Sequence, residues 1–215
     1  MCCWLDAPDH EAKDHLSAGW PLSDAPALVT LAQSIQVDTW SDSAEIGNQL
    51  RRRLGRNTQG AAKSLVLGGD SSTSAQRRQF VDKVAQWVQP RSRCPESSLD
   101  GWLIEVDGSD MYPAAEKILV DIGRQKCAIT MVVVREAHRA DSSALHILEP
   151  LLSGERSKVH TDVMLLFDAE ISAADQCSGG SGHFSCAQES LQKWIATNIW
   201  KRSGFVGRIT MFIPF

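Results

Sequence analysis

The feature that most constrains the fold is an alternation of short, almost wholly apolar runs with amphipathic segments. The strongest run, at 128–134, reads AITMVVV. Such a run is typical of a strand buried on both faces, as in a parallel sheet covered by helices. The same pattern predicts further strands at 64–67, 102–106, 163–167 and 209–213. The sequence therefore predicts an α/β fold, a parallel five-stranded sheet flanked by helices.

The segments between these runs carry apolar residues three and four positions apart, which predicts helices. The helices contain residues 80–88, 118–122, 145–152 and 191–199. Pro113 suits the first turn of the second helix, and Pro150 is expected to kink or shorten the third. Another helix is expected to begin near Asp42. We therefore interpret residues 41–215 as one domain and the Ala-, Asp-, Ser- and Pro-rich residues 1–40 as an extended or partly ordered arm.

The composition limits the classes of function. A chain of 215 residues that is 43% hydrophobic suits one globular domain, and a net charge of −4 gives no reason to expect a nucleic-acid partner. No apolar run approaches the roughly 20 residues of a membrane-spanning helix, and the first residues lack the pattern of a signal peptide. We expect a soluble chain without membrane insertion, which leaves open that it is one domain of a longer membrane protein.

The six cysteines include no CxxC pair. Cys177, His183 and Cys186 lie close together in a Gly/Ser-rich stretch, where a metal site, a loop disulfide and unpaired thiols are the alternatives. Zinc normally takes four ligands and no fourth candidate is near, so we predict no metal. Cys127 opens an apolar run and is expected to be a buried small hydrophobe.

The turn after the first strand is where an α/β nucleotide-binding protein holds phosphate. A P-loop there reads GxxxxGK[ST], with backbone N–H groups around the phosphates and a lysine that neutralises their charge. Residues 68–75 read GGDSSTSA. Gly69 helps open the loop, but Thr73 and Ser74 stand where Gly and Lys belong. Asp70 adds a negative charge, and like charges 4 Å apart repel by about 4 kcal/mol at an effective dielectric of 20.

The end of the third strand is altered as well. In P-loop ATPases an Asp there helps hold magnesium and a Glu polarises the attacking water. Here Glu136 remains, while Arg135 replaces the Asp and repels Mg²⁺. These losses predict a core that neither binds nor hydrolyses a nucleotide and has no cofactor, with Arg135 and Asp70 as candidates to pair across the site. A generic flavodoxin-like domain and an ATPase that retains weak nucleotide binding are the alternatives.

Longer stretches resemble a known family. Residues 129–152, with LEPLL at 148–152, resemble the Walker B region of torsins, the AAA+ ATPases of the endoplasmic reticulum and nuclear envelope. Residues 64–87 resemble the torsin P-loop and its helix without the P-loop chemistry. FVGRITMFIP at 205–214 is more similar still to the luminal domains of the torsin activators, lamina-associated polypeptide 1 and its endoplasmic-reticulum relative. The resemblance covers about residues 45–215 and implies an AAA+-like domain without the helical lid of an active AAA+ protein.

The resemblance also implies a function. In the torsin activators an arginine followed by Ile-Ser opens the final strand and serves as an arginine finger for torsin, and Arg208-Ile209-Thr210 matches it. The implied protein is a non-catalytic cofactor in the lumen of the endoplasmic reticulum or nuclear envelope. It would bind a torsin-like AAA+ ATPase in its ATP-bound state and activate hydrolysis by supplying Arg208 in trans. The alternative is a scaffold or tethering domain without effect on ATP hydrolysis, in which Arg208 is only an exposed arginine at a strand edge.

Overall fold

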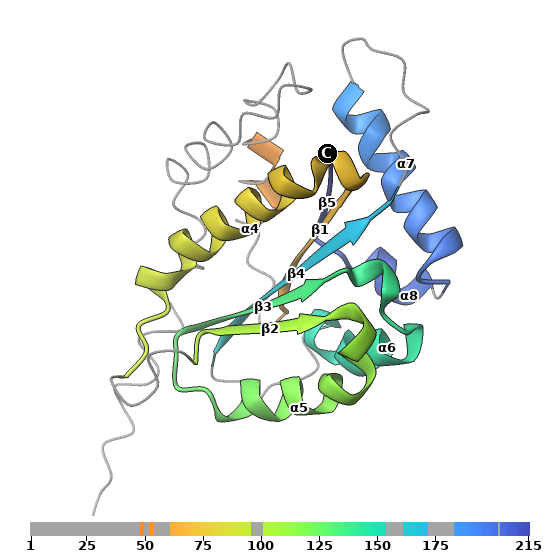
Figure 1. The fold of residues 1–215 in the computed structure, drawn as a ribbon. Coiled ribbons are helices and arrows are strands. Elements are labelled where there is room, and N and C mark those ends of the chain that lie inside the picture. Colours follow the sequence, from red (N-terminus) through yellow and green to blue (C-terminus); the bar gives the residue numbers. More distant parts are fainter. Residues whose placement is uncertain are drawn as a thin grey trace, which may run out of the picture.

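The computed structural model describes residues 48–49, 52–53, 61–95, 101–153, 161–171, 183–201 and 203–215. Five strands in these ranges form one parallel sheet in the order β2-β3-β4-β1-β5 (Figure 1). The strands are β1 Lys63–Gly69, β2 Leu103–Asp107, β3 Ile129–Arg135, β4 Asp162–Glu170 and β5 Met211–Pro214. The prediction of an α/β fold with a five-stranded parallel sheet flanked by helices is confirmed.

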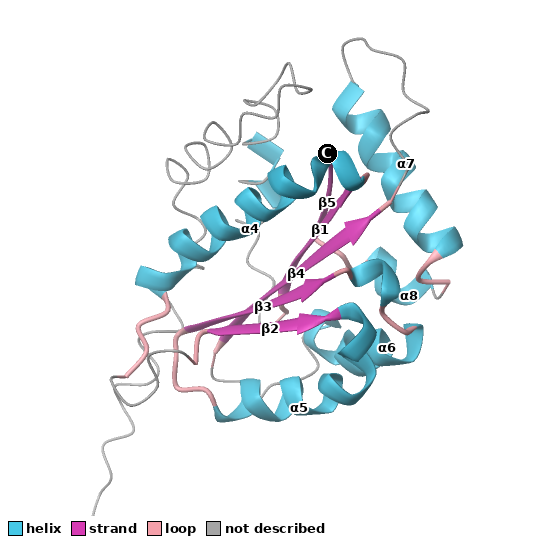
Figure 2. Ribbon diagram, in the orientation of Figure 1, coloured by secondary structure: helices cyan, strands magenta, loops and turns pink. Residues whose placement is uncertain are grey.

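Helices cover both faces of the sheet, as Figure 2 shows. They are α4 Ser74–Val88, α5 Met111–Arg124, α6 Ser142–Ser153, α7 His183–Asn198 and α8 Ser203–Gly207. Helix α4 packs on one face, and α5, α6, α8 and most of α7 pack on the other. Helix α6 continues through Pro150 to Ser153, so the proline does not end the helix, and the alternative of a kink at Pro150 stays a prediction. The next two residues, Leu151 and Leu152, are buried and hold the last turn against the core.

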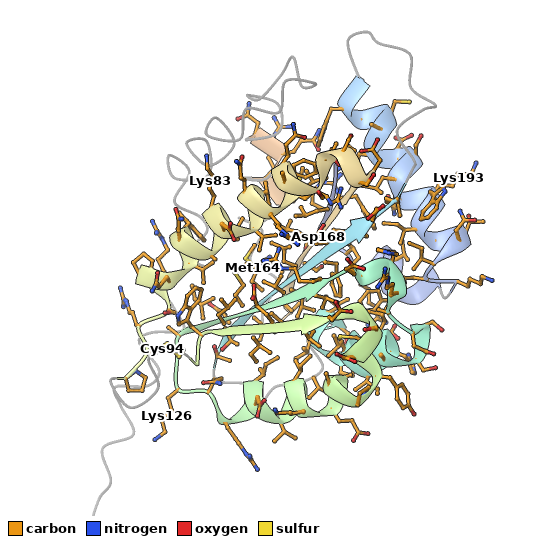
Figure 3. All side chains as sticks on the ribbon, viewed as in Figure 1. Lys83, Cys94, Lys126, Met164, Asp168 and Lys193 are labelled. Carbon is orange, nitrogen blue, oxygen red and sulfur yellow. A yellow bond between two sulfur atoms is a disulfide. The ribbon has the colours of Figure 1, made fainter. Side chains whose placement is uncertain are left out.

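The two faces of each central strand supply two separate hydrophobic cores. In β3, Val132 and Val134 join the cluster beneath α5 and α6, while Met131 and Val133 join the cluster beneath α4. All four side chains are fully buried. Side chains fill the space on both sides of the sheet (Figure 3). This double burial explains why the strand reads as a continuous apolar run rather than an alternating one.

A disulfide joins Cys94, in the segment after α4, to Cys127, just before β3, with Cα atoms 4.2 Å apart. Cys127 is buried as expected, and it also forms half of a disulfide that the sequence did not indicate. Cys186 is also disulfide-bonded. Cys177 lies outside the described residues.

The expected helix near Asp42 is described only at 48–49 and 52–53, which are helical, and the expected arm at 1–40 lies outside the described residues. Within the described ranges, no helix has the length and hydropathy needed to cross a membrane. The same ranges contain no group of three His, Cys, Asp or Glu side chains placed to hold a metal ion.

Candidate functional site

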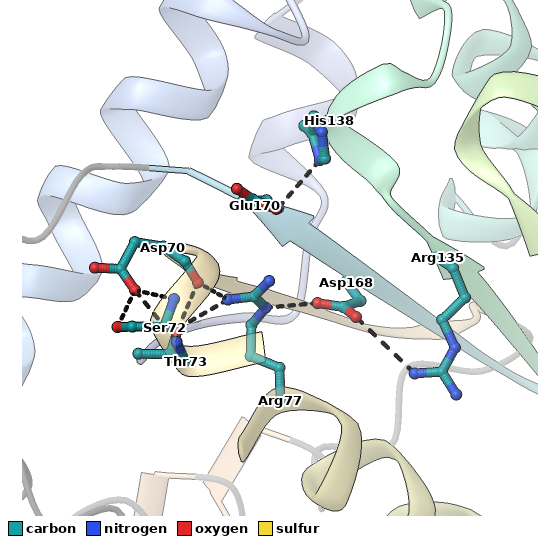
Figure 4. A network of polar contacts seen from close by, with 8 residues as sticks. All are labelled: Asp70, Ser72, Thr73, Arg77, Arg135, His138, Asp168 and Glu170. Carbon is teal, nitrogen blue, oxygen red and sulfur yellow. Dashed lines mark hydrogen bonds and ion pairs between the residues drawn. The ribbon is translucent and has the colours of Figure 1, made fainter. Parts of the chain in front are cut away.

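The carboxyl edge of the sheet carries a row of alternating charges. Asp70 follows β1, Asp168 lies near the end of β4, Arg135 ends β3, and Glu105 lies in β2. Parallel strands bring these residues to the same edge, where α/β proteins place their sites. Arg77 enters the row from the first turn of α4, as Figure 4 shows.

Arg77 is the centre of this network, and its side chain is only 4% exposed. Its Nε donates to Asp168 Oδ1 at 2.7 Å. Its Nη1 donates to the Asp70 carbonyl oxygen at 2.7 Å and to Thr73 Oγ1 at 2.8 Å. Hydrogen bonds from a charged donor at these distances are strong. The guanidinium therefore ties the loop after β1 to strand β4 and compensates the charge of Asp168 (Figure 4).

The Asp70 carboxylate closes the loop upon itself. Its Oδ1 accepts hydrogen bonds from Ser72 N at 2.9 Å, Ser72 Oγ at 2.5 Å and Thr73 N at 3.2 Å. The Ser72 hydroxyl contributes most to holding the pKa of Asp70 below its ordinary value, and the two backbone donors and the charge of Arg77 act in the same direction. In a phosphate-binding loop, N–H groups of this kind point at the phosphate. Asp70 thus both opposes phosphate by charge and occupies donors that phosphate needs.

Arg135 lies in the row but not where the sequence suggested. Its Nη2 donates to Glu105 Oε1 at 3.1 Å, and its Nη1 lies 3.9 Å from Asp168 Oδ2. The expected pairing of Arg135 with Asp70 is therefore wrong. Strand β4 lies between β3 and β1, so its Asp168 meets the guanidinium first, and Asp70 is engaged by its own loop.

Glu136 follows β3 in the left-handed conformation, with φ 48°. Its carboxylate Oε2 lies 3.0 Å from Arg139 Nε in the next turn. A Cβ on Gly108, at the end of β2, would lie 2.2 Å from the Glu136 carbonyl oxygen, so the two turns pack closely only because Gly108 has no side chain. The Glu is present at the carboxyl edge, as the sequence indicated, and it is partnered by a nearby arginine.

A small cavity adjoins the two glycines that open the loop. A cavity lined by Gly68, Gly69, Pro214 and Phe215, with three other residues, has a volume of about 10 Å³. That is room for about one water molecule, whereas ligand pockets are typically about 300–1,000 Å³. A Cβ on Gly69 would already lie 2.3 Å from Thr73 Oγ1. Ser74, at the position of the P-loop lysine, begins α4 and is exposed.

Arg208 lies toward the opposite end of the sheet. It precedes β5, and Met211 of β5 is in register with Leu65 of β1. Asp70 is five residues further along from Leu65, which corresponds to roughly 16 Å at about 3.3 Å per residue. Arg208 is 41% exposed, and its Nε lies 3.5 Å from Glu149 Oε1. The structure therefore separates Arg208 from the loop after β1, so this arginine does not reach a ligand held at that loop.

An open hollow of about 420 Å³ lies between α7 and α8. Its lining is formed by Glu189, Gln192, Lys193, Ala196, Val206 and Gly207. Arg208 follows Gly207 in the chain, but it does not line this hollow, and its side chain contacts Glu149 of α6 instead. Lys193, which does line the hollow, is labelled in Figure 3.

Two central residues of the network, Arg77 and Asp168, were not predicted from the sequence. A signal for Arg77 was present, because it lies three and four positions before Phe80 and Val81 and so shares their inward face. Asp168 follows a run of buried residues in β4 without a break in the strand. Arg77 and Asp168 contact each other across 91 residues of sequence, and no local sequence pattern predicts such a contact.

A parallel sheet in this order, with helices on both faces and a glycine-opened loop after β1, defines an AAA+-like α/β domain. Two structures of the AAA+ ATPase Hsp104 are similar to it. The S. cerevisiae Hsp104–casein complex in the extended conformation has a TM-score of 0.57 and 15% identity over 95% of this chain and 37% of that chain. The closed state of Hsp104 with ATPγS and FITC-casein has a TM-score of 0.53 and 14% identity. The match covers 90% of this chain and 36% of that chain.

This chain thus spans little more than a third of the length of those Hsp104 chains, and at such identities the similarity shows the fold alone. No family model matches the chain, and no curated protein matches its sequence. The AAA+-like part of the resemblance seen in the sequence is confirmed, and the torsin-activator family stays a prediction.

Proposed function

We propose that this chain is a non-catalytic cofactor that binds a torsin-like AAA+ ATPase in its ATP-bound state and activates ATP hydrolysis by supplying Arg208. The observation that carries the proposal is the contrast between the two ends of the sheet. The loop after β1 is occupied by Arg77 and closed by Asp70, while Arg208, a partly exposed arginine, lies toward the other end.

The absence of catalysis by the chain itself is supported by charge and space. A nucleotide at the loop would have to displace the Arg77 guanidinium and take the N–H groups of Ser72 and Thr73 from Asp70. It would also need a pocket far larger than the cavity of about 10 Å³ beside Gly69. Each of these changes costs free energy before any phosphate contact forms.

Activation in trans is supported by the placement of Arg208. A planar guanidinium with free N–H groups stabilises the negative charge that develops on a γ-phosphate in the transition state. Among the described residues Arg208 has one charged partner, Glu149, and it contacts this partner through Nε. The fork of terminal nitrogens, Nη1 and Nη2, is therefore left for a ligand on another molecule.

A luminal location in the endoplasmic reticulum or nuclear envelope is part of the proposal. The disulfide between Cys94 and Cys127 supports it, because disulfides persist in oxidising compartments and are rare in the cytosol.

The test is a steady-state ATPase assay of a purified torsin with Mg-ATP, titrated with this chain. Arg208→Ala is expected to keep binding an ATP-trapped torsin and to reduce stimulation at least tenfold, because a finger acts mainly in the transition state. Arg208→Lys is expected to rescue poorly, since an ammonium lacks the planar fork. Lys201→Ala, which removes an exposed positive charge a few residues away, serves as the control and should leave stimulation nearly unchanged.

Each failure has its own meaning. Binding without stimulation by the wild-type chain assigns the protein to the scaffold or tethering class. Stimulation that survives Arg208→Ala removes the arginine finger from the mechanism. Equal affinity for ADP-loaded and ATP-trapped torsin contradicts recognition of the γ-phosphate.

A further inference from the structure

Glu149 of α6 is the one charged partner of Arg208 among the described residues. We propose that Glu149 is a positioning residue, which holds the guanidinium of Arg208 by its Nε and leaves Nη1 and Nη2 directed to a phosphate of the partner. This inference rests on the proposed function and names the residue that orients its finger.

The carboxylate of Glu149 is itself held in place. Its side chain is only 20% exposed. Its Oε2 lies 2.8 Å from His146 Nδ1, one turn earlier in α6. Its Oε1 lies over the backbone of α8, where a Cβ on Gly204 would be 3.1 Å away. A carboxylate that contacts a histidine of its own helix and packs closely against α8 restricts the rotamers of the arginine it contacts.

The backbone beside Arg208 is fixed as well. Its N–H donates to the Phe205 carbonyl oxygen at 3.1 Å, and Ile209 N donates to Val206 O at 3.2 Å. Thr210 N donates to Ser64 Oγ at 3.0 Å, and Ser64 N donates back to Thr210 Oγ1 at 3.0 Å. The remaining freedom of Arg208 is therefore in its side chain, which is the part that Glu149 contacts.

The geometry of the pair suits orientation better than sequestration. A carboxylate that sequesters an arginine takes both ends of the fork in a bidentate contact at about 2.7–2.9 Å. Here the contact joins one carboxylate oxygen to Nε at 3.5 Å, and the Arg208 side chain stays 41% exposed. Partly exposed ion pairs are weak, so Glu149 biases the rotamers of Arg208 without trapping it.

The expected effect follows from that weakness. Glu149→Gln keeps the shape but loses the charge, and we expect the maximal stimulated rate of a torsin with Mg-ATP to fall about two- to fivefold. At about 1.4 kcal/mol per tenfold this corresponds to roughly 0.4–1 kcal/mol. The aspartate in Glu149→Asp is too short to reach Nε, so the maximal stimulated rate should fall at least as far in this variant. The concentration of this chain that gives half-maximal stimulation should change less than twofold, because positioning acts on the rate rather than on binding.

Two controls separate positioning from a structural role. Glu116→Gln removes an exposed helix carboxylate from α5 and should leave the stimulated rate unchanged. In the Arg208→Ala background, Glu149→Gln should have no further effect on rate, since residues that act as a unit are not additive. A loss of thermal stability or of affinity in Glu149→Gln that matches the loss of rate assigns Glu149 a structural role and overturns the proposal.

The orientation can also be measured without a partner. In the chain alone, ¹⁵Nε relaxation should show an ordered Arg208 side chain in the wild type and a mobile one in Glu149→Gln. Equal mobility of the Arg208 side chain in the wild type and in Glu149→Gln overturns the proposal. A stimulated rate that rises in Glu149→Gln also overturns it, because it shows that Glu149 restrains the finger. An ordered Arg208 in a wild-type chain that stimulates no torsin instead overturns the proposed function and shows that Glu149 orients the arginine for another ligand.

Discussion

Replacing Arg77 by Met tests whether the guanidinium is a structural part of the loop after β1. Methionine keeps much of the volume but removes the three hydrogen bonds to Asp168, Asp70 and Thr73. Removing one partner of a buried ion pair costs about 3–5 kcal/mol. Arg135 Nη1, 3.9 Å from Asp168 Oδ2, remains to compensate the orphaned carboxylate, so we expect about 3 kcal/mol. For a chain of this length that is a fall in Tm of roughly 6–12 °C.

Denaturant unfolding and thermal scans measure the loss. Arg78→Met changes the next arginine, which is exposed, and should stay within about 0.5 kcal/mol of the wild type. The double variant Arg77→Met/Asp168→Leu should recover part of the loss, since it removes both buried charges. A cost below about 1 kcal/mol for Arg77→Met, or a double variant less stable than the sum of the singles, would refute the idea that Arg77 holds this site closed by charge compensation.

The remaining predictions concern nucleotide binding, the disulfide and stability at low pH. Isothermal titration should show no binding of Mg-ATP or ADP at millimolar concentration, and micromolar affinity would contradict the closed site. Replacing Cys94 and Cys127 by Ala should lower stability by roughly 3–4 kcal/mol, from the loop entropy of 33 residues, as judged by urea unfolding. The pKa of Asp70 lies below its ordinary value of 3.8, so its carboxylate stabilises the fold above that pH and loses this contribution as the pH falls through the folded value. Asp70→Asn should therefore make acid unfolding less steep, as followed by circular dichroism.

The strands were predictable because a strand buried on both faces needs apolar or small residues at almost every position. Residues 129–134 are apolar or small at every position, and each of them is buried. Helix α8 was not predictable, because five residues containing two glycines show no helical period. The last strand begins at Met211 rather than at Ile209, because the chain is still turning out of α8 there and Ile209 N bonds back to Val206 O.

The candidate site was only half predictable. The substitutions at Asp70 and Arg135 could be seen against a known loop pattern, whereas their partners depend on contacts between distant segments. Arg77 reaches Asp168 across 91 residues, and Cys94 meets Cys127 across 33. A pattern of missing residues predicts that a ligand is lost, but it does not tell which side chain takes the ligand's place.

The charges that take that place have a consequence for regulation. The Asp70 carboxylate accepts N–H groups that a P-loop offers to phosphate, and the Arg77 guanidinium supplies the positive charge that lysine and metal supply in an ATPase. The loop is therefore held by side chains of the protein itself. Their contacts do not depend on the concentration of nucleotides in the cell. A switch that responds to a ligand needs two states with different affinity for that ligand. Under the proposed function the loop binds no nucleotide, so it has no such ligand. Under the proposed function the chain presents Arg208 in the same way at all times, so the moment of stimulation is set by the nucleotide state of the partner alone.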